Sequence, residues 1–136
     1  MTLYTSDIDA GRKLILKHAA ASLCGALFLA LFGGIYEHFS FGVFSVYMVY
    51  AFVFPLLSGL LLLLAAKGKH QPAQRTLFLL HAFTAACSVG CVAAGIIKIS
   101  GREHPLLIVY PLLGILLGIL ALISYCRDTK ADASPQ

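Results

Sequence analysis

The chain has 136 residues, of which 60% are hydrophobic and 12% charged, with a formal net charge of +4 at pH 7. Soluble domains carry about 25% charged residues, so roughly half of the charge that a water-exposed surface needs is missing. The Lys and Arg residues flank apolar runs and form no basic face with interleaved aromatic residues, which argues against nucleic acid as a partner. The composition predicts an all-α integral membrane protein with the lipid bilayer as its partner.

The first 17 residues contain two Asp ahead of the basic residues, and no small-residue cleavage site follows the first apolar run at signal-peptide spacing. We therefore expect residues 1–17 to be a cytoplasmic segment that leads into a retained helix. No lipidation or retention motif is visible at either end.

Four apolar stretches reach the roughly 20 residues that a helix needs to cross a ~30 Å hydrocarbon core. They predict transmembrane helices over 18–36, 43–66, 76–97 and 105–126 within one domain, 1–136. A cytoplasmic loop, 67–75, and an outer loop, 98–104, complete the predicted bundle. The polar tail, 127–136, is expected to be disordered.

The basic residues predict the orientation, because cytoplasmic loops are enriched in Lys and Arg. They gather before the first span, between the second and third, and after the fourth: Arg12, Lys13, Lys17, Lys67, Lys69, Arg75, Arg127 and Lys130. Lys98 and Arg102 are the exceptions, in the outer loop. The pattern predicts an antiparallel four-helix bundle with both termini in the cytoplasm, in the cell membrane and by inference the bacterial inner membrane.

A weak repeat relates the two halves. The segment HAAASLC begins at His18 and HAFTAAC begins at His81, while Phe54-Pro55 and Tyr110-Pro111 correspond in the following spans. The match indicates either two tandem helical hairpins or a chance likeness among Ala-rich and Leu-rich helices.

Small residues predict the helix contacts, because helices in lipid associate where backbones can approach closely. Such rows are Ser22, Ala26, Ala30 and Gly34 in the first span, Ala82, Ala86, Gly90 and Ala94 in the third, and Gly114-x-x-x-Gly118 in the fourth. We expect the first and third spans to meet near the centre, and Gly114 and Gly118 either to pack within the chain or to join a homodimer. Pro55 and Pro111 are expected to kink their helices.

Polar and aromatic side chains gather at the outer ends of the spans. The ligand-binding candidates are Tyr36, Glu37, His38, Tyr47, Tyr50 and Tyr110, with Glu103 and His104 in the outer loop. They predict either an outward-facing pocket of an acid, an imidazole and phenols, or an aromatic belt at the membrane interface.

His18 and His81 are candidates for a bis-histidine haem, which needs two rings at matched depth. Their distances from the flanking charges predict depths that differ by roughly 9 Å, so hydrogen-bonded or interfacial histidines are the alternative. The four cysteines, Cys24, Cys87, Cys91 and Cys126, form no metal or redox signature and suit helix packing.

No phosphate loop, nucleophile elbow or metalloprotease motif is present in the sequence, and we single out no catalytic or metal-binding residue. The leading hypothesis is a non-enzymatic membrane protein, without an identified cofactor, that binds or transports a small, amphipathic molecule or serves as an accessory subunit. The alternatives are a membrane redox protein, either a b-type haem protein or a quinone-linked one, and a structural or assembly subunit of a membrane complex.

In size and number of spans the chain is similar to the small multidrug resistance exporters. That resemblance implies the architecture alone. Those exporters work as dimers around an acidic residue in the middle of the first helix, whereas the first span here carries no acid until Glu37 at its outer end.

Overall fold

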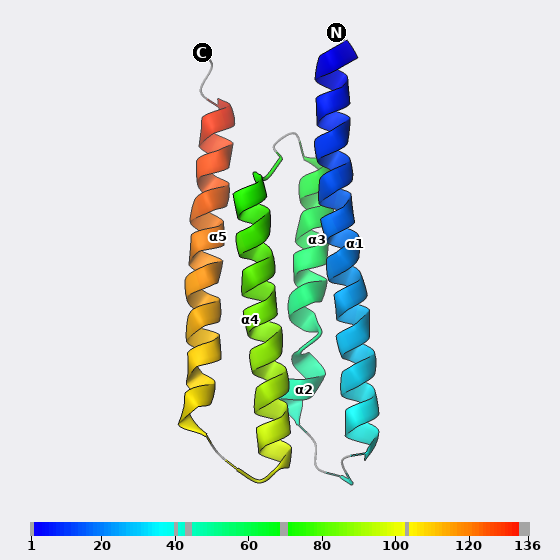
Figure 1. The fold of residues 1–136 in the computed structure, drawn as a ribbon, viewed down its shortest axis with the longest axis vertical. Helices are drawn as coiled ribbons and strands as arrows, with labels where there is room; N and C mark the ends of the chain where they lie inside the picture. Colours follow the sequence, from blue (N-terminus) through cyan, green and yellow to red (C-terminus); the bar gives the residue numbers. More distant parts are fainter. Residues whose placement is uncertain (1, 40, 43–44, 69–70, 103, 134–136) are drawn as a thin grey trace.

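The structure is a computed structural model that describes residues 2–39, 41–42, 45–68, 71–102 and 104–133. Its elements are α1 (Thr2–Phe39), α2 (Val46–Tyr50), α3 (Val53–Lys67), α4 (Gln74–Ile99), the short 3-10 helix η1 (Pro105–Ile108) and α5 (Val109–Ala133) (Figure 1). Four stretches are long and apolar enough to cross a membrane: Asp9–Phe39, Val46–Lys67, Gln74–Ile99 and Pro105–Ala131. The chain is thus a small polytopic membrane protein, as the composition predicts.

Two helices extend beyond the spans that hydropathy predicts. α1 begins at Thr2 and includes most of the N-terminal segment, and α5 continues to Ala133. The prediction of a disordered tail is therefore wrong for residues 127–133, while residues 134–136 lie outside the described part. The physical reason is a set of hydrogen bonds, described below, that Asp128 makes to the beginning of α4.

The second span is interrupted between α2 and α3. Pro55 has no N–H to donate, so the carbonyl of Ala51, four residues earlier, loses its helical partner. Ser88 on α4 donates its hydroxyl to this carbonyl at 3.3 Å. Pro111, in contrast, lies in the first turn of α5, where an N–H has no intrahelical partner anyway, and it does not interrupt the helix.

The long helices pack as antiparallel pairs, α1 with α3 and α4 with α5. The pairs join where α2 and α3 lie against α4, and α1 and α5 stand at opposite edges in Figure 1. Both termini and the α3–α4 connection lie at one end of the molecule, which we call the terminal end. The first and third spans touch near the terminal end, where His18 contacts His81, but the main neighbour of α1 is α3, so the expectation of a central interface between these two spans is wrong.

The buried face of α1 differs from the predicted row of small residues. It follows Ile15, Ala19, Ser22, Ala26 and Gly33, whereas Ala30 and Gly34 are exposed. A helix turns by roughly 100° per residue, so each four-residue step rotates the row by roughly 40° and carries it away from a straight partner. Gly34 consequently takes no part in packing within the described chain, and a Cβ built on it meets no atom within 4 Å.

A buried cluster near the terminal end joins three helices. Ile15 and Ala19 from α1, Leu62 and Ala66 from α3, and Leu77 from α4 form it. Most other large apolar side chains are exposed, and α5 is the least buried of the spans. Such an apolar exterior is what contact with lipid tails requires.

Candidate functional site

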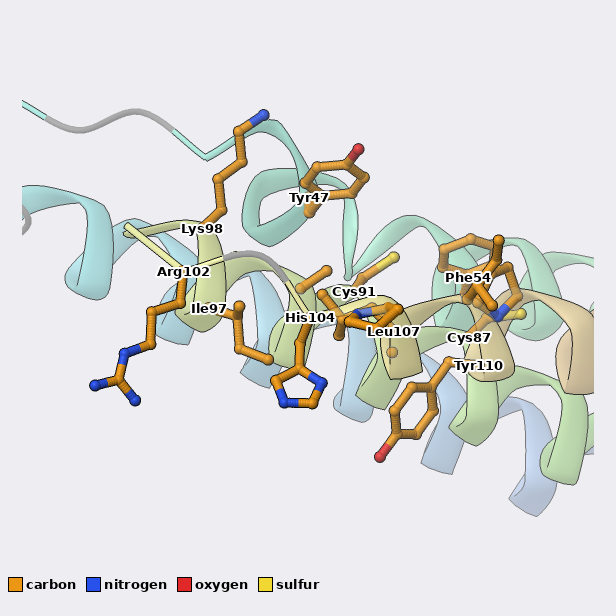
Figure 2. A pocket seen from close by; sticks show the side chains of 15 residues that line it. Tyr47, Phe54, Cys87, Cys91, Ile97, Lys98, Arg102, His104, Leu107 and Tyr110 are labelled. Atoms are coloured by element: carbon orange, nitrogen blue, oxygen red, sulfur yellow. The ribbon is translucent and has the colours of Figure 1, made fainter. Parts of the chain in front are cut away.

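A cavity of about 530 Å³ lies at the end of the molecule opposite the termini, between α2, α4 and the η1–α5 segment (Figure 2). Its polar lining residues are Tyr47, Lys98, Arg102, His104 and Tyr110. The walls are mostly apolar and include Phe54, Ala94, Ile97, Leu107, Ile108 and Pro111. An apolar cavity with a few polar groups is typical of a small-molecule site.

The end of α4 positions the two cations of the cavity. Gly101 adopts a φ of +67°, the left-handed conformation that glycine adopts without strain. The N–H of Gly101 donates to the carbonyl of Lys98 and that of Arg102 to the carbonyl of Ile97, both at 3.2 Å. This Schellman arrangement ends the helix, so that Lys98 lies in the last turn and Arg102 directly after it. Positive charge there also interacts favourably with the helix dipole.

Two glycines allow α2 to approach its neighbours closely. A Cβ on Gly33 of α1 would lie 3.1 Å from the carbonyl oxygen of Met48, and a Cβ on Gly95 of α4 would lie 3.0 Å from the Met48 Cβ. Met48 is therefore held between the two longer helices. Its neighbour Tyr47 is thereby placed beside α4, where the Nζ of Lys98 lies 5.2 Å from the centre of the Tyr47 ring. This distance corresponds to a cation–π interaction.

Tyr110 enters the site across Gly90. A Cβ on Gly90 would lie 2.5 Å from the Cβ of Tyr110, so only glycine allows this approach. Figure 2 shows the hydroxyl groups of Tyr47 and Tyr110 pointing in opposite directions. Of the six ligand-binding candidates, the structure brings these two to the cavity.

The other four candidates lie elsewhere. The Tyr36 ring is tilted against the Phe32 ring with centres 6.0 Å apart, and His38 lies edge-on to Phe39 at 5.6 Å. Glu37 is half-buried in the last turn of α1, and Tyr50 is 59% exposed. These residues do not line the cavity, and Glu103 lies outside the described residues.

The cavity contains two of the predicted phenols, Tyr47 and Tyr110, but the predicted acid Glu37 does not line it, and the charged groups that do are Lys98 and Arg102. In the sequence, Lys98 and Arg102 are the two cations of the predicted outer loop and depart from the Lys and Arg bias. This departure was the signal that could have identified them as site residues. Among the described lining residues there is no carboxylate. The charged side chains among the described lining residues, Lys98 and Arg102, are both cationic.

His18 and His81 are in direct contact, although the sequence predicts different depths. His18 Nδ1 and His81 Nε2 are 3.0 Å apart, and the ring centres are 5.0 Å apart at an interplanar angle of 38°. The depth prediction is wrong because α1 and α4 begin at different heights, so flanking charges are a poor common reference. A haem iron would have to lie between the two facing nitrogens, and this arrangement leaves no space for one. The pair does not fit a bis-histidine haem.

Gly114 and Gly118 face α4 of the same chain. A Cβ on Gly114 would lie 2.5 Å from the Sγ of Cys87, and one on Gly118 would lie 3.2 Å from Cδ2 of Phe83. The glycine motif is used in the α4–α5 interface and is not free to join two copies. Cys87 and Cys91 are half-buried beside this interface and line the cavity, whereas Cys24 and Cys126 are exposed.

Chemically, the cavity can hold an apolar group between its walls and a negative group beside Lys98 and Arg102. A comparison of the chain with family models, curated proteins and solved structures finds no match.

Proposed function

We propose that this membrane protein binds a small amphipathic molecule with an anionic head group in the cavity between α2, α4 and η1. The observation that carries the proposal is the pair of cations, Lys98 and Arg102, beside walls that are otherwise mostly apolar. The volume of about 530 Å³ is in the range of small-molecule sites.

The chemistry of the lining suggests how such a molecule would lie. A carboxylate or phosphate would accept hydrogen bonds from the guanidinium of Arg102, which can bind both oxygens at once, and from the ammonium of Lys98. The two side chains extend in opposite directions in Figure 2, so this contact requires them to turn towards the bound group. Its apolar part would extend towards Phe54 and Cys87, deeper in the membrane.

Transport of the same molecule is the second candidate. It is favoured by the interruption between α2 and α3, since irregular backbone at membrane depth is typical of transporter sites. Phe54, directly after the interruption, lines the cavity, so a movement there would alter the site.

We further propose that both termini lie in the cytoplasm, so that the cavity is near the outer surface of a cell membrane. The support is the excess of Lys and Arg at the terminal end. Fusion of a reporter that is active on one side only to the C-terminus would test this orientation, and activity on the outer side would contradict it.

Binding can be tested with the protein in nanodiscs and three fluorescent amphiphiles that share one tail and carry an anionic, a zwitterionic or a cationic head. We expect the anionic probe to bind most tightly. Lys98→Gln and Arg102→Gln should each weaken its binding about tenfold or more, since a hydrogen bond to a charged group is worth about 1.5–3 kcal/mol.

Arg127→Gln is the matched control, because it removes one cation at the terminal end and should leave binding unchanged. Equal affinity for the three probes, or equal losses in the control and in the two cavity variants, would refute the proposed site.

A further inference from the structure

The histidine pair lies inside the membrane at the terminal end and is distinct from the cavity. His81 is roughly 26 Å from Lys98 along α4 at a rise of ~1.5 Å per residue. A hydrocarbon core is ~30 Å thick, so the two rings lie just within its boundary on the terminal side. An ionisable group at such a depth indicates a functional site, most often a path for ions or protons.

Within the described part of the chain, the titratable group in contact with each ring of the pair is the other ring. Among the described residues, no Asp, Glu or Cys forms a cluster with the two rings. On the helices that pack around the pair, the nearest charged residues along the chain are Lys17, Lys67 and Arg75, all of them exposed. His18 Nε2 and His81 Nδ1 make no hydrogen bond within the described chain, so one of them is free to take a further proton.

Four hydroxyl groups continue from the pair towards the middle of the membrane, and we call them the hydroxyl seam: Ser22, Ser58, Thr84 and Ser88. Ser22 is one turn after His18 on the same face of α1. Ser58 lies at the level of Ser22, because its neighbour Gly59 is against the carbonyl of Ala19, with 3.4 Å to a built Cβ.

The far end of the hydroxyl seam is the interruption of the second span. Ser88 follows His81 by two turns of α4, roughly 10 Å deeper, and it donates to the Ala51 carbonyl that Pro55 leaves without a partner. The polar groups thus extend from the membrane boundary to irregular backbone in the interior. In membrane proteins, such backbone occurs where it is buried in protein or lines a water-filled space.

Two members of the hydroxyl seam are buried without a protein partner. Ser22 is 6% and Ser58 is 2% exposed, and neither Oγ makes a hydrogen bond in the described structure. Thr84, in contrast, donates to the carbonyl of Leu80 at 2.8 Å. A buried hydroxyl without a partner costs about 1–3 kcal/mol, and buried water commonly satisfies such groups.

We propose that the His18–His81 pair is a proton-binding site at the mouth of a chain of internal water molecules, which the hydroxyl seam holds as far as the Ala51 carbonyl. The ligands of this site are a proton and water, supplied from the terminal end.

The proton balance follows from the hydrogen bond between the rings. In the neutral pair each imidazole carries one proton, and one of these two protons is shared between His18 Nδ1 and His81 Nε2. The ring that donates the shared proton has an unprotonated outer nitrogen, which takes a third proton from water. The pair then carries one positive charge spread over two rings, and it returns this proton to water on release.

The first test follows the imidazole nitrogens by 15N NMR in bilayers, in a chain with His38→Gln, His70→Gln and His104→Gln so that only the pair is observed. We expect the pair to take up one proton, shared by both rings, as the buffer is acidified from about pH 8 to pH 4. Nitrogen signals that do not change across this range, or two rings that titrate as independent groups, would overturn the proposal.

The second test measures water at the hydroxyl seam. Ser22→Cys and Ser58→Cys are made in a chain whose four native cysteines are replaced by Ala, and each is treated with a small methanethiosulfonate. Only the hydrated thiolate reacts, so the Ser22→Cys and Ser58→Cys thiols should be labelled about tenfold faster than the thiol of Leu60→Cys. Leu60 is the control because it is exposed on the same helix as Ser58. Labelling no faster than at Leu60→Cys would contradict an internal water chain.

If the cysteine-free chain does not fold, NMR magnetisation transfer from water to the serine side chains of the unsubstituted protein tests for the same internal water. The absence of any transfer would contradict the water chain.

The proton-binding site and the anion-binding cavity can be refuted independently. Lys98→Gln should leave the titration of the pair unchanged, and His81→Gln should leave binding of the anionic probe unchanged.

Discussion

The carboxylate of Asp128 on α5 accepts a hydrogen bond from the hydroxyl of Thr76 in the first turn of α4, with Oδ2 and Oγ1 2.7 Å apart. The same oxygen accepts the backbone N–H of Ala73 at 3.0 Å, and Ser124 bonds to the Thr76 hydroxyl at 2.7 Å. No side chain of its own caps the beginning of α4. A residue near the end of the chain therefore supplies the negative charge that a helix N-terminus favours.

Replacing Asp128 should destabilise the α4–α5 pair. We expect Asp128→Ala to lower the free energy of unfolding by about 1–2 kcal/mol, as the loss of a helix cap does. Reversible unfolding in bicelles would measure this change. Arg127→Gln, next to it but exposed, is the control, and an equal effect of the two substitutions would show that the contact is not stabilising.

The bond between Ser88 and the Ala51 carbonyl should depend on Pro55. We expect Ser88→Ala alone to cost about 0.6 kcal/mol, the average measured for side-chain hydrogen bonds between membrane helices, and no more than the measured maximum of about 1.7 kcal/mol. In a Pro55→Ala chain the amide of residue 55 can donate to Ala51 itself, so Ser88→Ala should then cost much less. A double-mutant cycle in bicelles gives the difference, and strictly additive effects would contradict this account of the interruption.

Gly114 and Gly34 should respond in opposite ways to the same substitution. Gly114→Ala places a methyl group against Cys87 Sγ, and we expect a loss of about 1–3 kcal/mol, as is usual for overpacking. Gly34→Ala adds a methyl group at an open position and should be neutral or stabilise by up to about 1 kcal/mol through helix propensity.

The mass of the Gly114→Ala protein in detergent tests whether Gly114 also joins two copies of the chain. Because Gly114 packs against α4 of its own chain, the oligomeric state should not change. A shift from dimer to monomer without loss of the fold would instead show that the motif joins two copies.

The positions of the four spans could be predicted from the sequence alone, since crossing hydrocarbon requires an uninterrupted run of apolar residues and no knowledge of neighbours. The interruption near Pro55 was also predictable, because a missing N–H is a local property. The extent of α5 was not, because residues 127–133 are polar and their helix includes Asp128, whose bonds are to residues more than fifty positions away.

The contacts between helices were decided by the tertiary structure. Lipid is as apolar as Leu, so hydropathy does not indicate which face of a helix meets another helix. Gly114 and Gly34 look alike in the sequence, yet one is packed and the other exposed, because the rotation of each helix depends on its partner. The same rotation and height brought His18 to His81, placed Lys98 over the Tyr47 ring, and brought Arg102 and Tyr110 to the same cavity. The composition alone indicates that the chain spans a membrane. Its candidate sites, in contrast, form only through contacts between segments that are distant in the sequence.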